Sequence, residues 1–258
     1  MPSTPSKPSS RVRRPGVVIA AVAMAAVLLG IASFTALKPH DKSEERRATA
    51  AAAEKESAAA ENRLMALARR DPGDRLAMGR ADAPVVMIEY ADFQCGYCGK
   101  FARDTEPELI EKYVDEGVLR IEWRNLPIFG EESENAARGA WAAGQQGRFW
   151  QFHTAAYAEG AKEKGFSEDR VKELAKEAGV PDLRRFAADA RSAAARAAVK
   201  RDQDEGYGIG VSSTPSFLIN STPIAGAQPL TAFTDAIETA RRADANKPLA
   251  EDTEGSAQ

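Results

Sequence analysis

The sequence predicts an α/β fold that carries an all-helical insertion and is preceded by an N-terminal transmembrane helix. Three observations predict it: an uncharged apolar run near the N-terminus, strand-like segments on either side of a helical segment, and a long helical region before further strands. A chain of 258 residues with 43% hydrophobic content can bury one sizeable core. The formal net charge of -3, with both signs interspersed, leaves no large basic face, so nucleic acid is not an expected partner.

The apolar run covers residues 16–37 and contains no charged residue. At about 1.5 Å per residue, a helix of this length is about 33 Å long and can span a bilayer. Four basic residues and no acid precede it: Lys7, Arg11, Arg13 and Arg14. The positive-inside rule places residues 1–15 in the cytoplasm and exports everything after Lys38.

A cleaved signal peptide is the alternative for this run, because Gly30 and Ala32 are small residues at cleavage spacing. The apolar run exceeds the about 7 to 15 residues that are usual in a signal peptide, so we expect an uncleaved signal-anchor. In both cases the bulk of the chain is extracytoplasmic, and with an uncleaved anchor it belongs to a single-pass protein of the cell membrane. Disulfides form and persist in that environment.

Residues 38–75 are expected to form an Ala-rich helical stalk, because residues 43–70 are rich in Ala, Glu, Lys and Arg and contain no Gly or Pro. Leu64, Leu67 and Ala68 form a narrow apolar stripe that could rest on the domain or on a second copy of the chain. The pattern favours a solvated spacer. The sequence DPGD at residues 71–74 ends the helix.

A strand, a helix and a second strand follow the stalk. Residues 85–90 form an apolar, β-branched run that is typical of a strand buried on both faces. A helix is expected from about residue 98 to 116, bent at Pro107 and ended by Gly117. Residues 118–125 alternate apolar and charged side chains, which predicts a strand with one charged face. Together they predict a βαβ unit with a right-handed crossover.

The segment of about residues 130–206 is expected to be an all-helical insertion with helices at residues 134–146, 149–158, 168–178 and 182–204. Phe149, Trp150 and Phe152 are expected in its core, and His153 is expected to be a satisfied or surface histidine rather than a catalyst. The glycine-rich residues 206–210 are expected to connect the insertion back to the sheet.

The sheet resumes with strands at residues 216–220 and around Ile224, and a helix at residues 230–242 follows them. The main domain is therefore expected to cover residues 76–245, and residues 246–258 to form a flexible tail.

The only two cysteines, Cys95 and Cys98, lie in ADFQCGYCGKF, where the first strand gives way to its helix. Three chemistries fit this spacing: half of a zinc site, a structural crosslink, or a redox dithiol. A structural zinc site requires four N or S ligands. Only His40, in the juxtamembrane linker, and His153 could join the two cysteines, which makes a Cys2His2 site a poor interpretation. A crosslink that closes so short a loop constrains the unfolded chain little. A C-x-x-C beside a βαβ unit therefore indicates redox exchange.

The predicted position of Cys95 explains how the pair could work. A sulfur at a helix N-terminus meets unpaired N–H groups and the positive end of the helix dipole, so Cys95 should ionise more readily than a free thiol. Cys98 lies one turn further along and should be more buried. After Cys95 forms a mixed disulfide with a substrate, Cys98 can attack it and release the product.

The segments EYADFQCGYCGKFARDTEPEL and GVSSTPSFLIN, with the helical insertion, resemble DsbA-like thiol:disulfide oxidoreductases of the thioredoxin superfamily, in the membrane-anchored form of Gram-positive bacteria and actinobacteria. The resemblance covers about residues 76–242 and implies a thioredoxin-like fold. It also implies that Cys95 is the nucleophile, Cys98 the resolving cysteine, and Pro215 a cis-proline facing the active site.

The resemblance assigns further residues. Thr214 would offer its backbone to an extended substrate peptide. Glu89 would be the acidic residue beneath Cys98, where a raised pKa would allow it to take the proton of that thiol. The alternative is a strand-end Glu89 that reaches solvent, because glutamate is seldom fully buried.

Gly96 and Tyr97, between the cysteines, are expected to contact substrate and depart from the Pro-His of strongly oxidising members. A helix dipole alone should lower the pKa of Cys95 by about one unit. We therefore expect a redox potential between that of thioredoxin and those of the strongest oxidants.

The resemblance implies a membrane-tethered oxidase that introduces disulfides into exported proteins with reduced cysteines. It implies reoxidation by a VKOR-like or DsbB-like membrane protein, and no cofactor or metal beyond the redox-active Cys95–Cys98 disulfide. The alternatives are a reductase or isomerase of the same fold, and a non-enzymatic module for metal delivery or assembly.

Overall fold

The computed structural model describes residues 42–246. The predicted transmembrane segment 16–37, the cytoplasmic residues 1–15 and all but the first residue of the predicted tail lie outside this range. Within the described range, no helix combines the length and the apolar character that a membrane span requires.

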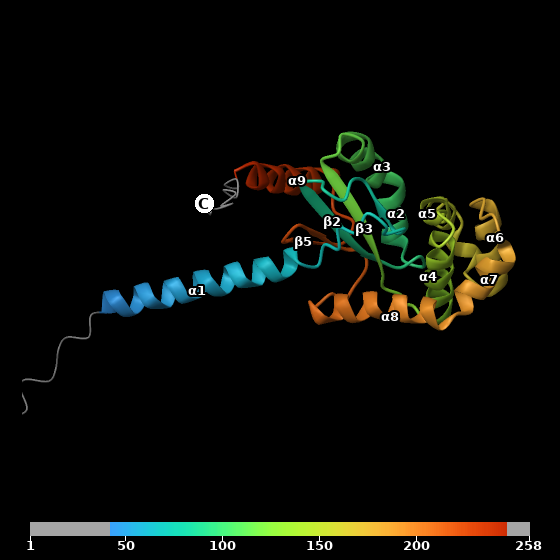
Figure 1. Cartoon of the computed structure of the whole chain (residues 1–258), viewed down its shortest axis with the longest axis horizontal. Helices are drawn as coiled ribbons and strands as arrows, with labels where there is room; N and C mark the ends of the chain where they lie inside the picture. Colours follow the sequence, from blue (N-terminus) through green and yellow to red (C-terminus); the bar gives the residue numbers. More distant parts are fainter. Residues whose placement is uncertain (1–41, 247–258) are drawn as a thin grey trace, which may run out of the picture. The chain divides into compact units, whose positions relative to one another are not determined.

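A five-stranded mixed sheet forms the centre of the domain (Figure 1). Its strands are β1 (Ala77–Met78), β2 (Val85–Ala91), β3 (Leu119–Asn125), β4 (Ser216–Ile219) and β5 (Thr222–Ala225), in the order β1-β3-β2-β4-β5. Strands β2 and β3 pair in parallel, as the predicted βαβ unit requires, and the other pairs are antiparallel. Strand β1 was not predicted, because two residues carry no periodicity.

Two helices and one π-helical turn connect β2 to β3, where the sequence predicts one bent helix. They are α2 (Gly96–Asp104), α3 (Glu106–Leu109) and the π-helix η1 (Ile110–Val114). The break falls at Thr105, two residues before Pro107, which lies in the first turn of α3. Proline has no N–H to donate to the preceding turn. Gly117 ends the segment with a φ of 73°, the left-handed conformation that glycine adopts without steric cost.

The helical insertion between β3 and β4 consists of α4 (Glu131–Gly144), α5 (Phe149–Ala156), a 3-10 turn η2 (Lys162–Lys164), α6 (Glu168–Glu177), α7 (Leu183–Arg191) and α8 (Ala193–Gly208). The single helix predicted at residues 182–204 is wrong. Ser192 has an extended backbone, and its Oγ accepts a hydrogen bond from the N–H of Ala195, so it ends α7 and caps α8. The predicted connection at 206–210 is partly wrong, because Gly206 and Gly208 lie in α8.

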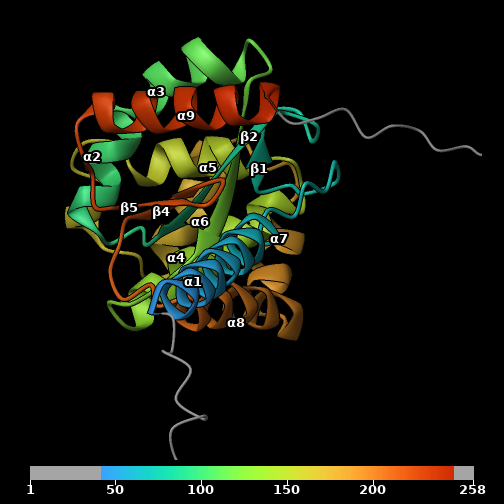
Figure 2. The ribbon, with the colours of Figure 1, turned by 90° about the vertical axis from the view of Figure 1, so that its left-hand side faces the viewer.

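Helices cover both faces of the sheet. Figure 2 shows α9 (Leu230–Ala245) on one side of the strands and α8 on the other. Phe217 and Ile219 of β4 pack against Phe233 of α9 and Phe101 of α2. A second group of buried aromatic side chains joins the end of β2 and β3 to the insertion, and it includes the predicted core residues Phe149 and Phe152.

The residues between the end of α1 and β1 contact the domain. Helix α1 (Lys42–Met65) ends six residues before the predicted break at Asp71. Leu64, Leu67 and Ala68 pack against the face of the sheet that contains Tyr90. For these residues the favoured prediction of a solvated spacer is wrong, and the alternative of contact with the domain is correct.

The charged face predicted for β3 is buried, because α8 and the segment that follows α1 cover it. Glu122 bonds to Arg120 at 2.9 Å and to Arg124 at 2.8 Å, and it accepts the backbone N–H groups of Arg69 and Arg70. Each buried charge on this face of β3 therefore has a partner of opposite sign, which burial requires.

Candidate active site

Cys95 is the N-cap residue of α2, directly after the turn that follows β2. Its backbone is extended (φ -76°, ψ 117°), its N–H donates to the carbonyl of Asp92, and its carbonyl accepts the N–H of Gly99. The sequence folds this way because β2 ends at Ala91 and glycines at positions 96 and 99 put no side chain around the sulfur. The sulfur therefore lies at the positive end of the helix dipole, as predicted.

The two thiols differ in environment. Cys95 is 6% exposed and Cys98 is fully buried, and both cysteines are free. A hydrogen bond from the Cys98 thiol lowers the pKa of Cys95 to about 5, against the opposing effect of burial, and the backbone N–H groups of Cys98 and Tyr97 assist. This lowering exceeds the effect expected from the helix dipole alone, because the neighbouring sulfur contributes most. Burial first, and then the Cys95 sulfur, raise the pKa of Cys98.

Thr214 and Pro215 lie against the Cys95 sulfur. The Cys95 Sγ is 3.2 Å from the Thr214 carbonyl oxygen, to which the protonated thiol donates. The Thr214–Pro215 peptide bond is cis, and Pro215 immediately precedes β4. The structure thus brings together residues that are about 120 positions apart in the sequence, at the place the resemblance implies.

Of the two residues between the cysteines, Tyr97 is 69% exposed, whereas Gly96 lies at the edge of a hollow beside Cys95. This hollow of about 290 Å³ is also lined by Arg103, Tyr157 and Lys162. The Lys162 Nζ is 3.5 Å from the place where a Cβ on Gly96 would lie. An extended chain bound at Cys95 could enter this hollow.

Asp92, which the sequence prediction did not single out, fixes the turn before Cys95. One carboxylate oxygen accepts the N–H of Gln94, and the other accepts those of Ile128 and Phe129. The Tyr157 hydroxyl donates to the Asp92 carbonyl at 3.0 Å. Asp92 comes directly after β2, and this position is the signal in the sequence that could have identified it as a site residue.

Glu89 is fully buried in β2, and neither of its carboxylate oxygens has a hydrogen-bond partner among the described residues. The alternative that it reaches solvent is wrong. Burial raises its pKa well above the ordinary value, and the nearby Glu106 and Cys95 raise it further. A buried carboxyl with a raised pKa is able to exchange a proton with a thiol. Its electrostatic effect on Cys98 is consistent with the position that the resemblance implies.

Two more buried titratable groups lie near the site, and the sequence prediction gave neither of them a role. Glu106 of α3 is buried, and burial raises its pKa to about 8. His153 of α5 is also buried, and burial lowers its pKa to about 3. The prediction of a satisfied or surface histidine is wrong, because His153 Nε2 has no partner within residues 42–246. No local motif marks Glu106, because its burial arises only in the folded chain.

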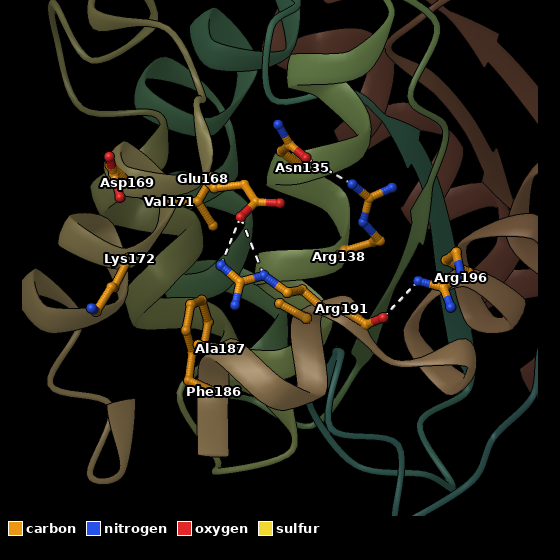
Figure 3. A pocket seen from close by; sticks show the side chains of 11 residues that line it. Asn135, Arg138, Glu168, Asp169, Val171, Lys172, Phe186, Ala187, Arg191 and Arg196 are labelled. Carbon is orange, nitrogen blue, oxygen red and sulfur yellow. Dashed lines mark hydrogen bonds and ion pairs between the residues drawn. The ribbon is translucent and has the colours of Figure 1, made fainter. Parts of the chain in front are cut away.

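A second hollow of about 290 Å³ lies in the insertion between α4, α6 and α7. Figure 3 shows Arg191 paired with Glu168, and Arg138 bonded to Asn135, around it. Val171 and Phe186 form its apolar part. Neither cysteine lines this hollow, so it is separate from the thiol chemistry.

A family model described as thioredoxin matches residues 71–239. The chain belongs to the thioredoxin family. Among solved structures, BdbD from Bacillus subtilis in its oxidised form has a TM-score of 0.61 at 21% identity, and the similarity covers 66% of this chain and 94% of that one. A thioredoxin-like oxidoreductase from Silicibacter pomeroyi has a TM-score of 0.59 at 28% identity, with 67% and 94% covered. The predicted thioredoxin-like α/β fold is confirmed.

Curated relatives refine this assignment. A probable disulfide bond formation protein D from Bacillus cereus is 30% identical over 149 residues, which are 55% of this chain and 68% of the relative. A Na(+)/H(+) antiporter NhaA from Salinispora tropica is 35% identical over 157 residues, 58% of this chain, but the chain spans only 22% of that antiporter. The predicted membership in the DsbA-like group, and with it the class of protein thiol:disulfide oxidoreductase, is confirmed.

Proposed function

We propose that this chain oxidises pairs of cysteines in exported proteins, with Cys95 as nucleophile and Cys98 as resolving residue. The observation that carries this proposal is the contrast between the two sulfurs. The pKa of Cys95 is lowered to about 5, whereas that of the fully buried Cys98 is raised. A stabilised Cys95 thiolate favours the reduced protein over its disulfide, which makes the disulfide form an oxidant.

The reaction consists of two exchanges. A substrate thiolate attacks the Cys95 sulfur of the protein disulfide, the bond between Cys95 and Cys98 breaks, and Cys98 leaves and takes up a proton. A second substrate thiolate then attacks the substrate sulfur of the mixed disulfide. The substrate leaves oxidised, and Cys95 leaves as the thiolate that its surroundings stabilise.

Thr214 and Pro215 are proposed to align the substrate chain. The Thr214 carbonyl lies within hydrogen-bond distance of the Cys95 sulfur, so a chain that reaches Cys95 passes along this backbone. Gly96 and the exposed Tyr97 are proposed to contact the same chain from the first turn of α2. Glu89 is proposed to exchange the proton of Cys98.

The cellular setting is part of the proposal. Residues 16–37 would anchor the chain, the domain would lie outside the cytoplasm, and a VKOR-like or DsbB-like membrane protein would reoxidise the cysteines. The name of the Bacillus cereus relative, disulfide bond formation protein, supports the direction of the reaction. A potential between that of thioredoxin and those of the strongest oxidants also stays a prediction.

A Cys98→Ala variant expressed in cells tests the function. It should accumulate exported proteins as mixed disulfides through Cys95, and Cys95→Ala should accumulate none. A dithiol that is reduced at steady state in the wild type would favour the reductase or isomerase. A metal-delivery module would trap no protein through Cys95 and would bind copper(I) through the two thiols.

A further inference from the structure

The proton of Cys98 has no direct path to water. Cys98 is fully buried, and on the proposed function its sulfur alternates between a disulfide and a thiol in each cycle. One proton must therefore cross the protein interior each time the sulfur leaves or attacks. The inference below rests on that proposed function and concerns the route of this proton.

Two buried carboxyl groups lie on the inner side of the active site. Glu89 belongs to β2 and Glu106 to α3, and the electrostatic interaction between them raises the pKa of Glu89. Both oxygens of Glu89 and the Oε1 of Glu106 have no hydrogen-bond partner among the described residues. Buried polar atoms are nearly always bonded to protein or water, so this unpaired cluster calls for a functional explanation.

Glu106 lies next to a pocket and also interacts with Glu89. With His153 it lines a pocket of about 300 Å³ between α2, α3 and α5, which is large enough to hold water. The His153 Nδ1 is 3.8 Å from the Glu106 Oε2. Near the thiols, the Tyr157 hydroxyl donates to the Asp92 carbonyl, and both Asp92 carboxylate oxygens accept backbone N–H groups. Unlike those of Glu89, both oxygens of the Asp92 carboxylate therefore have partners.

We propose that Glu106, with His153 beside it, passes the proton of Glu89 to and from water in this pocket. During reoxidation the Cys98 thiol gives its proton to the Glu89 carboxylate, and the Cys98 sulfur attacks Cys95 in the mixed disulfide. The bond from Cys95 to the partner sulfur breaks, and the partner leaves as a thiolate. The proton then moves from Glu89 to Glu106 and on to water. Substrate oxidation runs the same route in reverse.

The charged and titratable groups around Glu106 come from each element packed against it. They are Glu89 of β2, Arg103 of α2, Glu111 and Asp115 at the two ends of η1, and His153 of α5. Arg103 donates to the Tyr157 carbonyl at 2.7 Å. His153 is neutral at neutral pH, so its ring can accept a hydrogen bond from protonated Glu106. The pH dependence of the proton route should therefore follow Glu106.

Glu106→Gln tests the proposal, because glutamine has the shape of the protonated acid but carries no exchangeable acidic proton. Reduced full-length protein is mixed with glutathione disulfide, and acid-quenched samples are analysed by mass spectrometry to time the attack of Cys98 on the Cys95–glutathione disulfide. We expect this step to be about tenfold or more slower at pH 7, with an unchanged equilibrium constant with glutathione. Acetate at high concentration should restore part of the rate, since it can enter the pocket.

Glu111→Gln is the matched control, because Glu111 lines the same pocket but is exposed. It should leave the rate, and its pH profile, at the wild-type values. A Glu106→Gln rate within about twofold of wild type, or an equal slowing by Glu111→Gln, would overturn the relay. A changed equilibrium constant or a lowered thermal midpoint would instead show a structural role and overturn it too. If the wild-type protein itself forms no disulfide, the proposed function fails rather than the relay.

Discussion

Cys95 and Cys98 are three positions apart, yet their surroundings shift their acidities in opposite directions. The Cys95 sulfur accepts a hydrogen bond from the Cys98 thiol and lies near backbone N–H groups of the first turn of α2, whereas Cys98 has lost all contact with water. The sequence predicts this contrast in direction, since it follows from the N-terminus of a helix. The sequence cannot predict how far each pKa shifts, because the contribution of each sulfur depends on its burial.

Removal of the Cys98 thiol should make Cys95 less acidic. Cys98→Ala removes the hydrogen bond from the Cys98 thiol, which contributes most to the lowered pKa of Cys95. The pKa of Cys95 should therefore rise above about 5 by about one unit or more. Titration of thiolate absorbance near 240 nm measures it. An unchanged pKa in the variant would show that the helix terminus alone determines it.

The ionisation of Cys95 should also make the stability of the reduced protein pH-dependent. Its folded pKa of about 5 is below the unfolded value of about 8.5, so the unfolded chain binds more protons between these values. The contribution of Cys95 to the free energy of unfolding should therefore be full above about pH 8.5 and be lost as the pH falls through about 5. Urea unfolding of reduced wild type and reduced Cys95→Ser across this range checks it. A constant difference between the two proteins contradicts it.

The contribution of Glu89 to the free energy of unfolding should depend on pH in the opposite direction. Because its pKa is raised in the folded protein, the folded state retains a proton that the unfolded chain loses above about pH 4.3. Its contribution to stability is therefore full below about pH 4.3 and declines as the pH rises. Glu89→Gln should match wild type in unfolding free energy near pH 4 and exceed it at pH 8, where the folded wild type retains a proton that the unfolded chain has lost. Equal stability at both pH values would indicate that Glu89 titrates normally.

At the scale of elements, strand and helix periodicity predicts β2, β3, α4, α5, α6 and α9 within a few residues. The misses share a cause. Residues 182–204 have a continuous helical composition, and only the side-chain bond of Ser192 separates α7 from α8. Strand β1 exists because Ala77 and Met78 pair with β3, a long-range contact that leaves no local pattern.

The role of Ser192 as a cap can be measured. Ser192→Ala removes the acceptor for the Ala195 N–H and the donor to the Asp189 carbonyl. We expect a loss of about 1 kcal/mol in the free energy of unfolding, while the pKa of Cys95 stays unchanged because the cap lies in the insertion. Urea unfolding checks the first and thiolate absorbance the second. No loss of stability would mean that packing alone separates the two helices.

At the scale of the whole described domain, a buried ion network ties the chain before β1 to the sheet and the insertion. Glu122 and Arg124 of β3, Arg69 of the preceding segment, and Asp202 and Glu205 of α8 bond to one another. The alternation of residues 118–125 predicts a charged strand face but not what covers it. Arg69 and Glu205 are 53 and 81 positions away from their partners Glu122 and Arg124, so only the folded chain shows that this face is buried.

Glu122→Gln should destabilise the domain, because it leaves Arg120 and Arg124 without their shared carboxylate. We expect a loss of about 3 kcal/mol near neutral pH. The Arg120 hydrogen bond and the backbone N–H of Arg69 help to lower the pKa of Glu122 to about 2 against the opposing effect of burial. Its contribution is therefore full above about pH 4.3 and is lost as the pH falls through about 2.

Urea unfolding at pH 7 and pH 2.5 measures both effects. The difference between wild type and Glu122→Gln should shrink at the lower pH, provided that both proteins remain folded without urea. A difference of the same size at both values would mean that the network acts through shape rather than charge.

The most direct test of the account is the pH dependence of alkylation of the reduced wild-type protein, with the modified cysteine identified by mass spectrometry. The account predicts that Cys95 reacts first, with a midpoint near the pKa of about 5, and that Cys98 stays unmodified while the domain is folded. A Cys95 midpoint near the value of about 8.5 for a free thiol, or Cys98 reacting first, would contradict it.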